Sequence, residues 1–587
     1  MSASRDQDIV VDVAKSRLSD FWKLEDYWAI WLGFTILLVA YICFASAGPR
    51  AAMEKQLTPL LATMQAEQER APFKTVAWHN ANDRKAGIHP RRSEAGQFFN
   101  KYLASPNRWA SNIVESFYRS DDDAKARRDK AAEAFDKAKA TTAAALTAAQ
   151  AAENAAAEVK FADDKLNDAA NAAIEKWQSA VKREVRARDA ASVRGYNLFI
   201  SLPLLCLALG LFFAIGITFM GGNVPKFLIA FIAVFFVAVL AQCFGNQTDM
   251  RYYGVSAEAW AIILGMLVAN TVGTPQWLKP GLNVEYYIKT GLVLLGAEIL
   301  LSKILAIGVP GIFVAWVVTP IVLVVTFIFG QKVLQMESKT LNITVSADMS
   351  VCGTSAAIAT AAACRAKREE LTLAIGISLA FTATMMIFMP AAIKALGINP
   401  VLGGAWIGGV VDSTGAVTAA GAFLGPTAMA VAATVKMIQN VLIGFTAFAV
   451  AVYWVTVVDS QAGVPINPFE IWHRFPKFVI GFLLASIFFS TLGGAYGTDV
   501  ANATIDQGVI RGLSGGLRGW FFVLAFSAIG LSTDFRVLAK YFKGGKPVIL
   551  YVFGQSFNAF LTLAMAYVMF HIVFPDVTES LLQGTLN

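Results

Sequence analysis

The chain has 587 residues, of which 56% are hydrophobic and 16% are charged, and its formal net charge is +7. Soluble domains are about 45–50% apolar and about 25% charged, so this composition excludes an ordinary soluble protein and indicates a polytopic membrane protein. The basic residues lie in short loops beside apolar segments, so the positive charge does not indicate nucleic-acid binding.

The N-terminal segment, residues 1–27, precedes the first long apolar run. Its apolar residues, including Ile9, Val13 and Phe21, have the spacing of an interfacial amphipathic helix, and a frayed tail is equally compatible with the pattern. Residues 28–48 form the first predicted transmembrane helix. This run is long and lacks a small-residue cleavage site, so we interpret it as a retained anchor rather than a signal peptide.

A polar insertion, residues 49–195, follows the first span. No glycine or proline occurs between Pro106 and Gly195, and the alanine-rich composition of residues 121–188 favours continuous helix. Closely packed alanine faces predict an antiparallel helical hairpin or an intersubunit coiled coil, and a solvated helix is the simpler alternative. We expect the insertion to be periplasmic, and long outer helices make a homodimer the default expectation.

Residues 196–587 form the predicted transmembrane transporter domain. Many of its apolar runs approach the roughly 20 residues that cross a bilayer. The predicted spans, after the first, are 197–219, 226–244, 255–272, 284–302, 309–330, 369–395, 426–456, 477–494, 515–534 and 547–572. The expected fold class is an all-α polytopic membrane protein with about 11 spans, two re-entrant or broken helices and an inserted, coiled-coil-like polar domain.

Two short segments, 342–363 and 402–423, interrupt the apolar sequence with Asp, Gly, Ser and Thr. Lys and Arg in short loops indicate the cytoplasmic side, and they place the N-terminus in the cytoplasm. Segment 342–363 has basic flanks on both sides, so it is expected to enter the membrane and return. Segment 402–423 is then expected to enter from the opposite side. Paired interruptions of this kind indicate a transport site.

Three acidic residues are predicted at membrane depth: Glu298, Asp348 and Asp412. A carboxylate at the centre of a membrane helix costs about 2.5–3.5 kcal/mol or more, so each is a candidate to handle a coupling ion, H⁺ or Na⁺. The alternatives are structural. Asp348 and Asp412 could cap helices, and Glu298 could pair with Lys303.

Small hydroxyl residues and glycines accompany the two aspartates. A Gly-Thr-Ser turn that opens a half-helix presents free N–H groups and the positive end of the helix dipole, which suits an oxyanion. Close packing of small residues is the alternative. Lys436 is a candidate anion ligand or a structural counter-ion. The candidate substrate-binding residues are Ser350, Gly353, Thr354, Ser355, Ser413, Thr414, Gly415 and Lys436.

No enzymatic motif is recognisable in the sequence. There is no Walker A lysine loop for ATP, no hydrolase triad, and no metal-ligand spacing among the five cysteines. We therefore expect no enzyme activity, no metal and no cofactor beyond a coupling ion, and the expected partners are the lipid bilayer and a small anion.

From about residue 252 to 571 the chain resembles the YeiH-type sulfate exporter family of bacterial inner-membrane proteins. The matching motifs, in chain order, are Gly291–Gly296, Leu305–Ile312, Gly330–Val333, Ser350–Gly353, Ala419–Gly421, Lys436–Met437 and Ala528–Thr533. The resemblance implies a multi-span secondary carrier that exports sulfate or a related small anion.

The chain departs from this family's pattern at the acidic residues. Where this chain has Asp412-Ser413, family members carry His-Glu; they carry a basic residue at Glu298 and a small neutral one at Asp348. Acidic residues at these positions make the binding of a bare divalent anion electrostatically less favourable. They favour a coupling cation, a proton or a cationic substrate, and the long insertion also lies outside the usual family outline.

The sequence leaves three hypotheses. The first is an ion-coupled secondary transporter of a small anion. The second is a cation/proton exchanger in which Asp348 and Asp412 are the whole site. The third is a membrane sensor or channel that works through the helical insertion.

Overall fold

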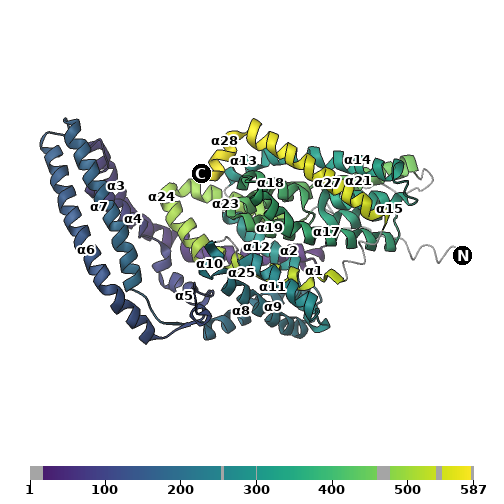
Figure 1. Cartoon of the computed structure of the whole chain (residues 1–587), viewed down its shortest axis with the longest axis horizontal. Coiled ribbons are helices and arrows are strands. Elements are labelled where there is room, and N and C mark those ends of the chain that lie inside the picture. The colour runs from purple at the N-terminus through teal and green to yellow at the C-terminus, as the bar shows by residue number, and fades with distance from the viewer. Residues whose placement is uncertain (1–17, 253–256, 299–300, 459–475, 537–544, 584–587) are drawn as a thin grey trace. The chain divides into compact units, whose positions relative to one another are not determined.

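The computed structural model describes residues 18–252, 257–298, 301–458, 476–536 and 545–583 (Figure 1). They are almost entirely helical, and the strands among them are the two-residue segments β1 (Tyr118–Arg119) and β2 (Tyr196–Asn197). The predicted all-α polytopic fold is confirmed. Most of the predicted amphipathic helix lies outside the described residues, and α1 (Asp20–Lys23) is a single turn.

The chain divides into two compact units. The membrane unit comprises residues 1–36, 208–490 and 517–587, and the insertion unit comprises residues 37–207 and 491–516. Helix α2 (Glu25–Phe44) belongs to both. The helices of the insertion unit are α3 (Ala47–Arg70), α4 (Val76–Ala86), η1 (Pro90–Arg92), α5 (Glu94–Tyr102), η2 (Ile113–Ser116), α6 (Asp121–Glu158), α7 (Asp164–Ala191), α24 (Thr498–Ala501) and η7 (Asn502–Ser514).

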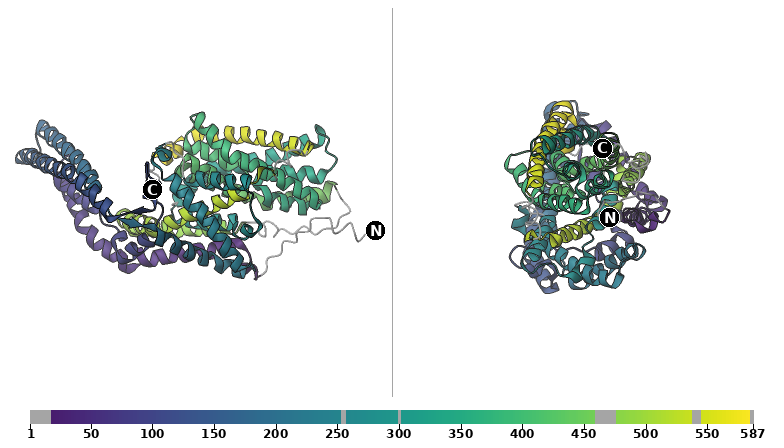
Figure 2. Two further views of the ribbon diagram at one scale, coloured as in Figure 1. Left: turned by 60° about the horizontal axis from the view of Figure 1, so that its bottom comes forward. Right: turned by 90° about the vertical axis from the view of Figure 1, so that its right-hand side faces the viewer.

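The alanine-rich part of the insertion folds as a hairpin of α6 and α7, which lie side by side in Figures 1 and 2. Ser120 begins α6 by accepting a hydrogen bond from the Asp123 N–H at 3.1 Å, and Asp163 caps α7 in the same way. Residues 160 and 161 have positive φ angles in the turn between them. Helices α6 and α7 therefore form an antiparallel hairpin within one chain, and the intersubunit coiled coil stays a prediction.

The remaining helices contribute to the membrane unit. Its helices before the first interrupted segment are α8 (Leu198–Phe219), α9 (Val224–Gly245), α10 (Thr248–Tyr252), α11 (Ala257–Thr271), η3 (Gln276–Gly281), α12 (Val284–Glu298), α13 (Leu301–Ile312), η4 (Phe313–Val317) and α14 (Val318–Lys332). Those that follow are α15 (Lys339–Ala347), η5 (Asp348–Cys352), α16 (Gly353–Ala363), α17 (Arg368–Ala395), α18 (Pro400–Val410), α19 (Thr414–Leu424), α20 (Pro426–Asn440), α21 (Leu442–Tyr453), η6 (Trp454–Val458), α23 (Phe478–Tyr496), α25 (Gly515–Ser532), α27 (Lys546–Tyr567), η8 (Val568–Val573) and α28 (Pro575–Gln583).

The predicted spans correspond to helices of the structure. Nine helices in the described part of the chain are long and apolar enough to cross a membrane: 25–44, 198–219, 224–245, 306–332, 369–395, 426–458, 478–496, 498–532 and 546–573. The predicted spans at 255–272 and 284–302 are the shorter helices α11 and α12, of 15 residues each. The predicted span at 515–534 is the second half of the helix 498–532, whose first half is too polar to be recognised by hydropathy.

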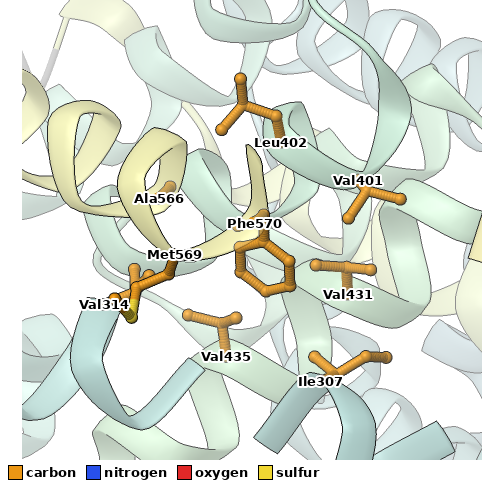
Figure 3. Packing of buried hydrophobic residues seen from close by; sticks show 10 residues of the cluster. Ile307, Val314, Val401, Leu402, Val431, Val435, Ala566, Met569 and Phe570 are labelled. Carbon is orange, nitrogen blue, oxygen red and sulfur yellow. The ribbon is translucent and has the colours of Figure 1, made fainter. Parts of the chain in front are cut away.

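A buried apolar cluster holds α13, η4, α18, α20 and η8 together, and Figure 3 shows Phe570 among the side chains of Val401, Val431 and Val435. Phe570 is 1% exposed and Val401, Val431 and Val435 are fully buried. Burying one such side chain contributes about 1.5–3 kcal/mol. The cluster fixes the first turn of α18 against α20, and α18 leads to the second interrupted segment.

Candidate functional site

The first interrupted segment forms a re-entrant hairpin of α15, η5 and α16, called hairpin 1 below. Helix α15 runs inward, and Cys364, just after α16, returns to its first turns. The Cys364 Sγ lies 3.9 Å from the Thr344 Oγ1 and 4.0 Å from the Thr340 O. The chain reverses at Gly353, whose φ of +43° is a conformation that L side chains rarely adopt.

The second interrupted segment forms hairpin 2 from α18 and α19. Asn399 begins α18 by accepting from the Leu402 N–H at 2.9 Å, and Ser413 begins α19 by accepting from the Ala416 N–H at 3.1 Å. A Cβ placed on Gly403 would lie 3.2 Å from the Leu424 Cδ1, so the two ends of the hairpin are adjacent.

Glycines on both arms of hairpin 2 let α20 pack against it at backbone distance. A Cβ on Gly404 would lie 2.5 Å from the Ala428 O, and a Cβ on Gly421 would lie 2.8 Å from the Met429 Cα. Small residues allow this close approach of membrane helices. Helix α20 therefore runs beside both arms and brings its polar C-terminal residues to the tip of hairpin 2.

The two hairpins approach from opposite ends of α17, and their tips meet. Helix α17 has 28 residues, about 42 Å at 1.5 Å per residue, and it joins the base of hairpin 1 to the base of hairpin 2. A Cβ on Gly353 would lie 3.3 Å from the Asp412 Cβ and 3.3 Å from the Ser378 Oγ of α17. This is the opposed arrangement that the loop charges predict.

Gln439 of α20 links the two tips through one amide group. Its Nε2 donates to the Ser350 O of hairpin 1 at 3.1 Å and to the Gly409 O of hairpin 2 at 3.2 Å. It also lies 3.1 Å from the Thr319 Oγ1 of α14. Carbonyls released by a helix break need donors when no water reaches them, and Gln439 provides one for each hairpin.

Lys436 lies one turn before Gln439 and is 1% exposed. Its Nζ donates to the Val351 O of hairpin 1 at 2.8 Å and to the Gln439 Oε1 at 2.7 Å. The ammonium group thus lies at the tip of hairpin 1, beside the Gln439 side chain, rather than at the surface.

The two aspartates have different environments. Asp412 is 1% exposed, and its Oδ2 accepts hydrogen bonds from the Tyr551 hydroxyl and from the Ser378 Oγ at 3.5 Å. Asp348 is 0% exposed, and neither of its carboxylate oxygens has a hydrogen bond of normal geometry within the described residues. Asp412 and Lys436 are the charged groups that interact with it electrostatically. Neither aspartate caps a helix, because Ser413 caps α19 and no side chain caps α16.

Some of the candidate hydroxyl residues are exposed, and the others are engaged in hydrogen bonds within the protein. Thr354 and Ser355 are exposed in the first turn of α16. The Ser350 Oγ bonds its own helix at the Ala347 O, and the Thr414 Oγ1 accepts from the Asn440 Nδ2 at 3.0 Å. Ser350 and Thr414 are therefore engaged internally, as Ser413 is, whereas Thr354 and Ser355 are exposed.

Gly415 and Glu298 contact other helices. A Cβ on Gly415 would lie 3.5 Å from the Ile529 Cδ1 and 3.7 Å from the Ile288 Cδ1, so this glycine packs against α25 and α12. The Glu298 Oε1 accepts from the Arg518 Nε at 2.7 Å. The structure thus gives Glu298 an ion-pair partner on α25, whereas the side chain of Lys303 lies outside what the structure describes.

Helix α27 supplies polar residues that the sequence analysis missed. Tyr551 holds Asp412, the Gln555 Nε2 donates to the Val410 O at 2.8 Å, and the Asn558 Nδ2 donates to the Gly409 O at 3.4 Å. The Thr562 Oγ1 continues the row to Asn558. Their spacing of four, three and four residues marks one face of a helix, so a search for polar stripes inside apolar spans could have found them.

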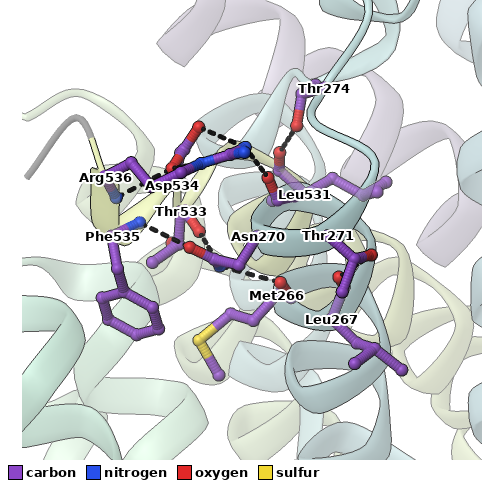
Figure 4. A network of polar contacts seen from close by, with 11 residues as sticks. Met266, Leu267, Asn270, Thr271, Thr274, Leu531, Thr533, Asp534, Phe535 and Arg536 are labelled. Atoms are coloured by element: carbon purple, nitrogen blue, oxygen red, sulfur yellow. Dashed lines mark hydrogen bonds and ion pairs between the residues drawn. The ribbon is translucent and has the colours of Figure 1, made fainter.

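A second polar network, at the ends of α11 and α25, is structural (Figure 4). The Asn270 side chain donates to the Thr533 O at 2.9 Å and accepts from the Phe535 N–H at 2.7 Å. Arg536 pairs with Asp534 and donates to the Ala269 O. These residues satisfy backbone groups where the two helices end.

Comparison with known proteins identifies the family. The family model described as Conserved hypothetical protein 698 matches residues 228–551. A UPF0324 membrane protein of Nitratidesulfovibrio vulgaris is 59% identical over 579 residues, which cover 99% of this chain and 100% of the relative. A UPF0324 membrane protein of Rhodopirellula baltica is 57% identical over 371 residues, 63% of this chain and 68% of the relative.

More distant relatives match a smaller share of the chain. A UPF0324 membrane protein of Nitrosomonas europaea is 30% identical over 376 residues, 56% of this chain and 75% of the relative. No solved structure matches. The chain therefore belongs to the UPF0324 family of membrane proteins, which is the YeiH-type sulfate exporter family that its sequence resembles.

Proposed function

We propose that this protein is an ion-coupled secondary active transporter of a small anion, sulfate or a related oxyanion or organic anion. The transport site is the junction of the two hairpin tips. Irregular backbone at membrane depth is tolerated where it is buried or lines a cavity, and opposed interrupted helices are the usual framework of a carrier site. The observation that carries the proposal is the fully buried Asp348 at that junction, whose two oxygens make no hydrogen bond of normal geometry with the residues that the structure describes.

The anion-binding part of the proposal depends on helix N-termini. Helices α16 and α19 both begin at the tips, and no side chain caps α16. Uncapped N–H groups and the positive end of the dipole attract an anion. The exposed hydroxyls of Thr354 and Ser355 lie in the same turn, so this end of α16 supports an oxyanion better than α19 does.

The coupling part depends on the acids. A buried carboxylate without partners is costly, and binding a cation or a proton removes the cost. Asp348 is therefore the proposed coupling residue, and Asp412, held by Tyr551 and Ser378, is its neighbour. Glu298 was the third candidate, and its ion pair with Arg518 supports a structural role in the membrane.

The direct test is uptake of radioactive sulfate into proteoliposomes containing the purified full chain, under imposed pH or Na⁺ gradients. Asp348→Asn is expected to abolish gradient-driven uptake, and Thr354→Val with Ser355→Ala is expected to weaken sulfate affinity. Asp136→Asn, at an exposed position of α6, is the matched control. Absence of uptake of sulfate and of competing small anions under every gradient would refute the anion transporter.

A cation/proton exchanger is the second candidate, favoured by the charges at the junction. Two carboxylates, Asp348 and Asp412, are buried there with one ammonium, Lys436. An exchanger needs no anion, so a pH-sensitive dye inside the liposomes should report proton movement driven by a Na⁺ or K⁺ gradient alone. Proton movement that requires sulfate instead supports the first candidate.

We further propose a multi-pass location in the bacterial inner membrane, with the N-terminus in the cytoplasm and the insertion outside. The loop charges of the sequence support this orientation. Protease added to intact spheroplasts should cut exposed sites of α6 and α7. Protection in spheroplasts, with cleavage after lysis, would reverse the orientation.

A further inference from the structure

Backbone carbonyls at helix breaks are the usual ligands of a coupling metal cation in carriers, and here they are already engaged. In hairpin 1 the Ser350 O accepts from Gln439 and the Val351 O accepts from Lys436. In hairpin 2 the Gly409 O accepts from Gln439 and Asn558, and the Val410 O accepts from Gln555. The carbonyls of hairpin 1 thus have donors from α20, and those of hairpin 2 have donors from α20 and α27.

The Lys436 ammonium occupies the position that a monovalent cation would take at the tip of hairpin 1. It is buried, and it lies 2.8 Å from the Val351 O and 2.7 Å from the Gln439 Oε1. A carbonyl has a second lone pair, but a positive charge at this distance repels any further cation. Lys436 therefore acts as a tethered cation that excludes Na⁺ from these carbonyls.

Asp348, unlike these carbonyls, has no set of donors around it among the described residues. Neither oxygen makes a hydrogen bond of normal geometry among the described residues, and the titratable groups that face it are Asp412 of hairpin 2, Lys436 of α20 and Tyr551 of α27. The Ser378 hydroxyl of α17 also lies close to this carboxylate, and it does not titrate. A single proton converts this carboxylate into a neutral acid and requires no coordination shell.

We infer that the coupling ion is a proton carried by Asp348, and that Lys436 fills the place of a metal cation at the same junction; this rests on the proposed function. The step transfers one proton and changes no oxidation state. The Asp348 carboxylate takes up one proton from the side to which the junction is open and becomes a carboxylic acid, and the O–H bond breaks again to release the proton on the other side. Asp412 remains the acceptor for Tyr551 and Ser378.

The first test is infrared difference spectroscopy of the purified full chain during a pH titration. The wild type should show the carbonyl band of a protonated carboxylic acid as the pH falls, and Asp348→Asn should lose it. Asp348→Glu should restore a band at a shifted frequency, which separates loss of the group from misfolding. The band should persist in Asp412→Asn. A band that survives Asp348→Asn overturns the assignment.

The second test asks whether Na⁺ binds at all. Two amide oxygens near the tips, the Gln555 Oε1 and the Asn440 Oδ1, also accept no hydrogen bond within the described part of the chain, and a sodium ion would use them together with Asp348. A ligand that binds only the folded state raises its stability, so the melting temperature is compared in NaCl and choline chloride at equal ionic strength. Equal melting temperatures are expected, and a rise specific to Na⁺ overturns the inference.

Neither test needs a transported solute. If sulfate uptake is absent but the Asp348 band and the Na⁺ insensitivity hold, the transporter assignment fails and the proton site stands. If uptake follows a Na⁺ gradient, the transporter stands and the proton inference fails.

Discussion

At the residue scale, the junction is distinguished by the number of buried polar side chains that form hydrogen bonds with one another or with backbone carbonyls. Asp348, Asp412 and Lys436 could be selected from the sequence because charged residues inside apolar runs are conspicuous. Tyr551, Gln555 and Ser378 could not be selected as readily, because a neutral polar residue in a span is common. Their role follows from three-dimensional contacts with carbonyls and a carboxylate that are distant in sequence.

Gln439 gives the first prediction, because its amide serves both tips and its Oε1 accepts from Lys436. Gln439→Leu keeps the approximate volume but withdraws these hydrogen bonds, and each buried group left unpaired costs about 1–3 kcal/mol. We expect a lower melting temperature of the purified protein in detergent. Gln150→Leu, exposed on α6, is the control and should change stability by less than about 0.5 kcal/mol. Equal effects of the two would contradict the linking role.

At the element scale, the sequence predicts two opposed hairpins but not which residues of their tips touch. Basic residues on both flanks of 342–363 require that it return, and the apolar length of α17 requires that 402–423 start from the other side. The meeting of Gly353 and Asp412 depends on the tilt and depth of four helices, which no local pattern encodes. Glu298 shows the same limit, since its partner Arg518 is 220 residues away.

Gly353 provides a prediction for hairpin 1. Gly353→Ala forces a side chain into a sparsely populated conformation with positive φ, at about 1–3 kcal/mol, and its Cβ would press on Asp412 and Ser378 at 3.3 Å. Sulfate uptake should therefore fall more than folded yield. Gly308→Ala is the matched control, because a Cβ there meets nothing within 4 Å and helix propensity favours alanine by about 1 kcal/mol. Comparable loss of uptake in both variants would refute a specific role for the tip.

His79 gives a pH prediction for the insertion unit. Burial lowers the pKa of His79, with Asp83 raising it and Lys74 lowering it further, and its ring packs edge-on against Trp177 of α7 at 6.2 Å. The unfolded chain takes up this proton near pH 6.5, whereas the folded chain does so at lower pH. Stability is therefore complete above about pH 6.5 and falls as the pH drops toward the folded pKa.

The measurement is the denaturant midpoint of the full chain, followed by tryptophan fluorescence at several pH values. Because His79 is partly exposed, a small slope is expected. His79→Phe keeps an aromatic ring and should flatten the slope below pH 6.5. An unchanged slope in this variant would assign the pH dependence to other groups.

At the scale of the whole molecule, hydropathy and composition predict the spans and the helical insertion well, because lipid leaves a helix few alternatives. They do not predict that residues 491–516 join the insertion unit. The Lys85 Nζ pairs with the Asp499 Oδ1 at 2.9 Å, and Arg91 donates to the Arg511 O. These contacts connect segments more than 400 residues apart. Neither segment has a local sequence pattern that predicts the contact.

Removal of the α6–α7 hairpin at its base would distinguish the transporter hypothesis from the sensor hypothesis. Strands β1 and β2 pair Arg119 with Tyr196 immediately below the hairpin. A two-residue Asn-Gly turn closes an antiparallel pair, so it can replace residues 121–194 without pulling the strands apart. Because Phe73 and Val76 pack on the hairpin, Phe73→Ser and Val76→Thr should accompany the replacement to keep the uncovered surface soluble.

If the junction of the hairpin tips performs transport, this shortened chain should take up sulfate within about twofold of the full chain, since distant and independent sites act additively. Asp348→Asn should abolish uptake in both backgrounds. A sensor or channel that works through the insertion predicts the reverse pattern, in which the shortened chain is inactive and Asp348→Asn has no effect. Proteoliposome uptake by the four proteins, each checked for a single folded peak in detergent, therefore decides which part of the chain carries the function.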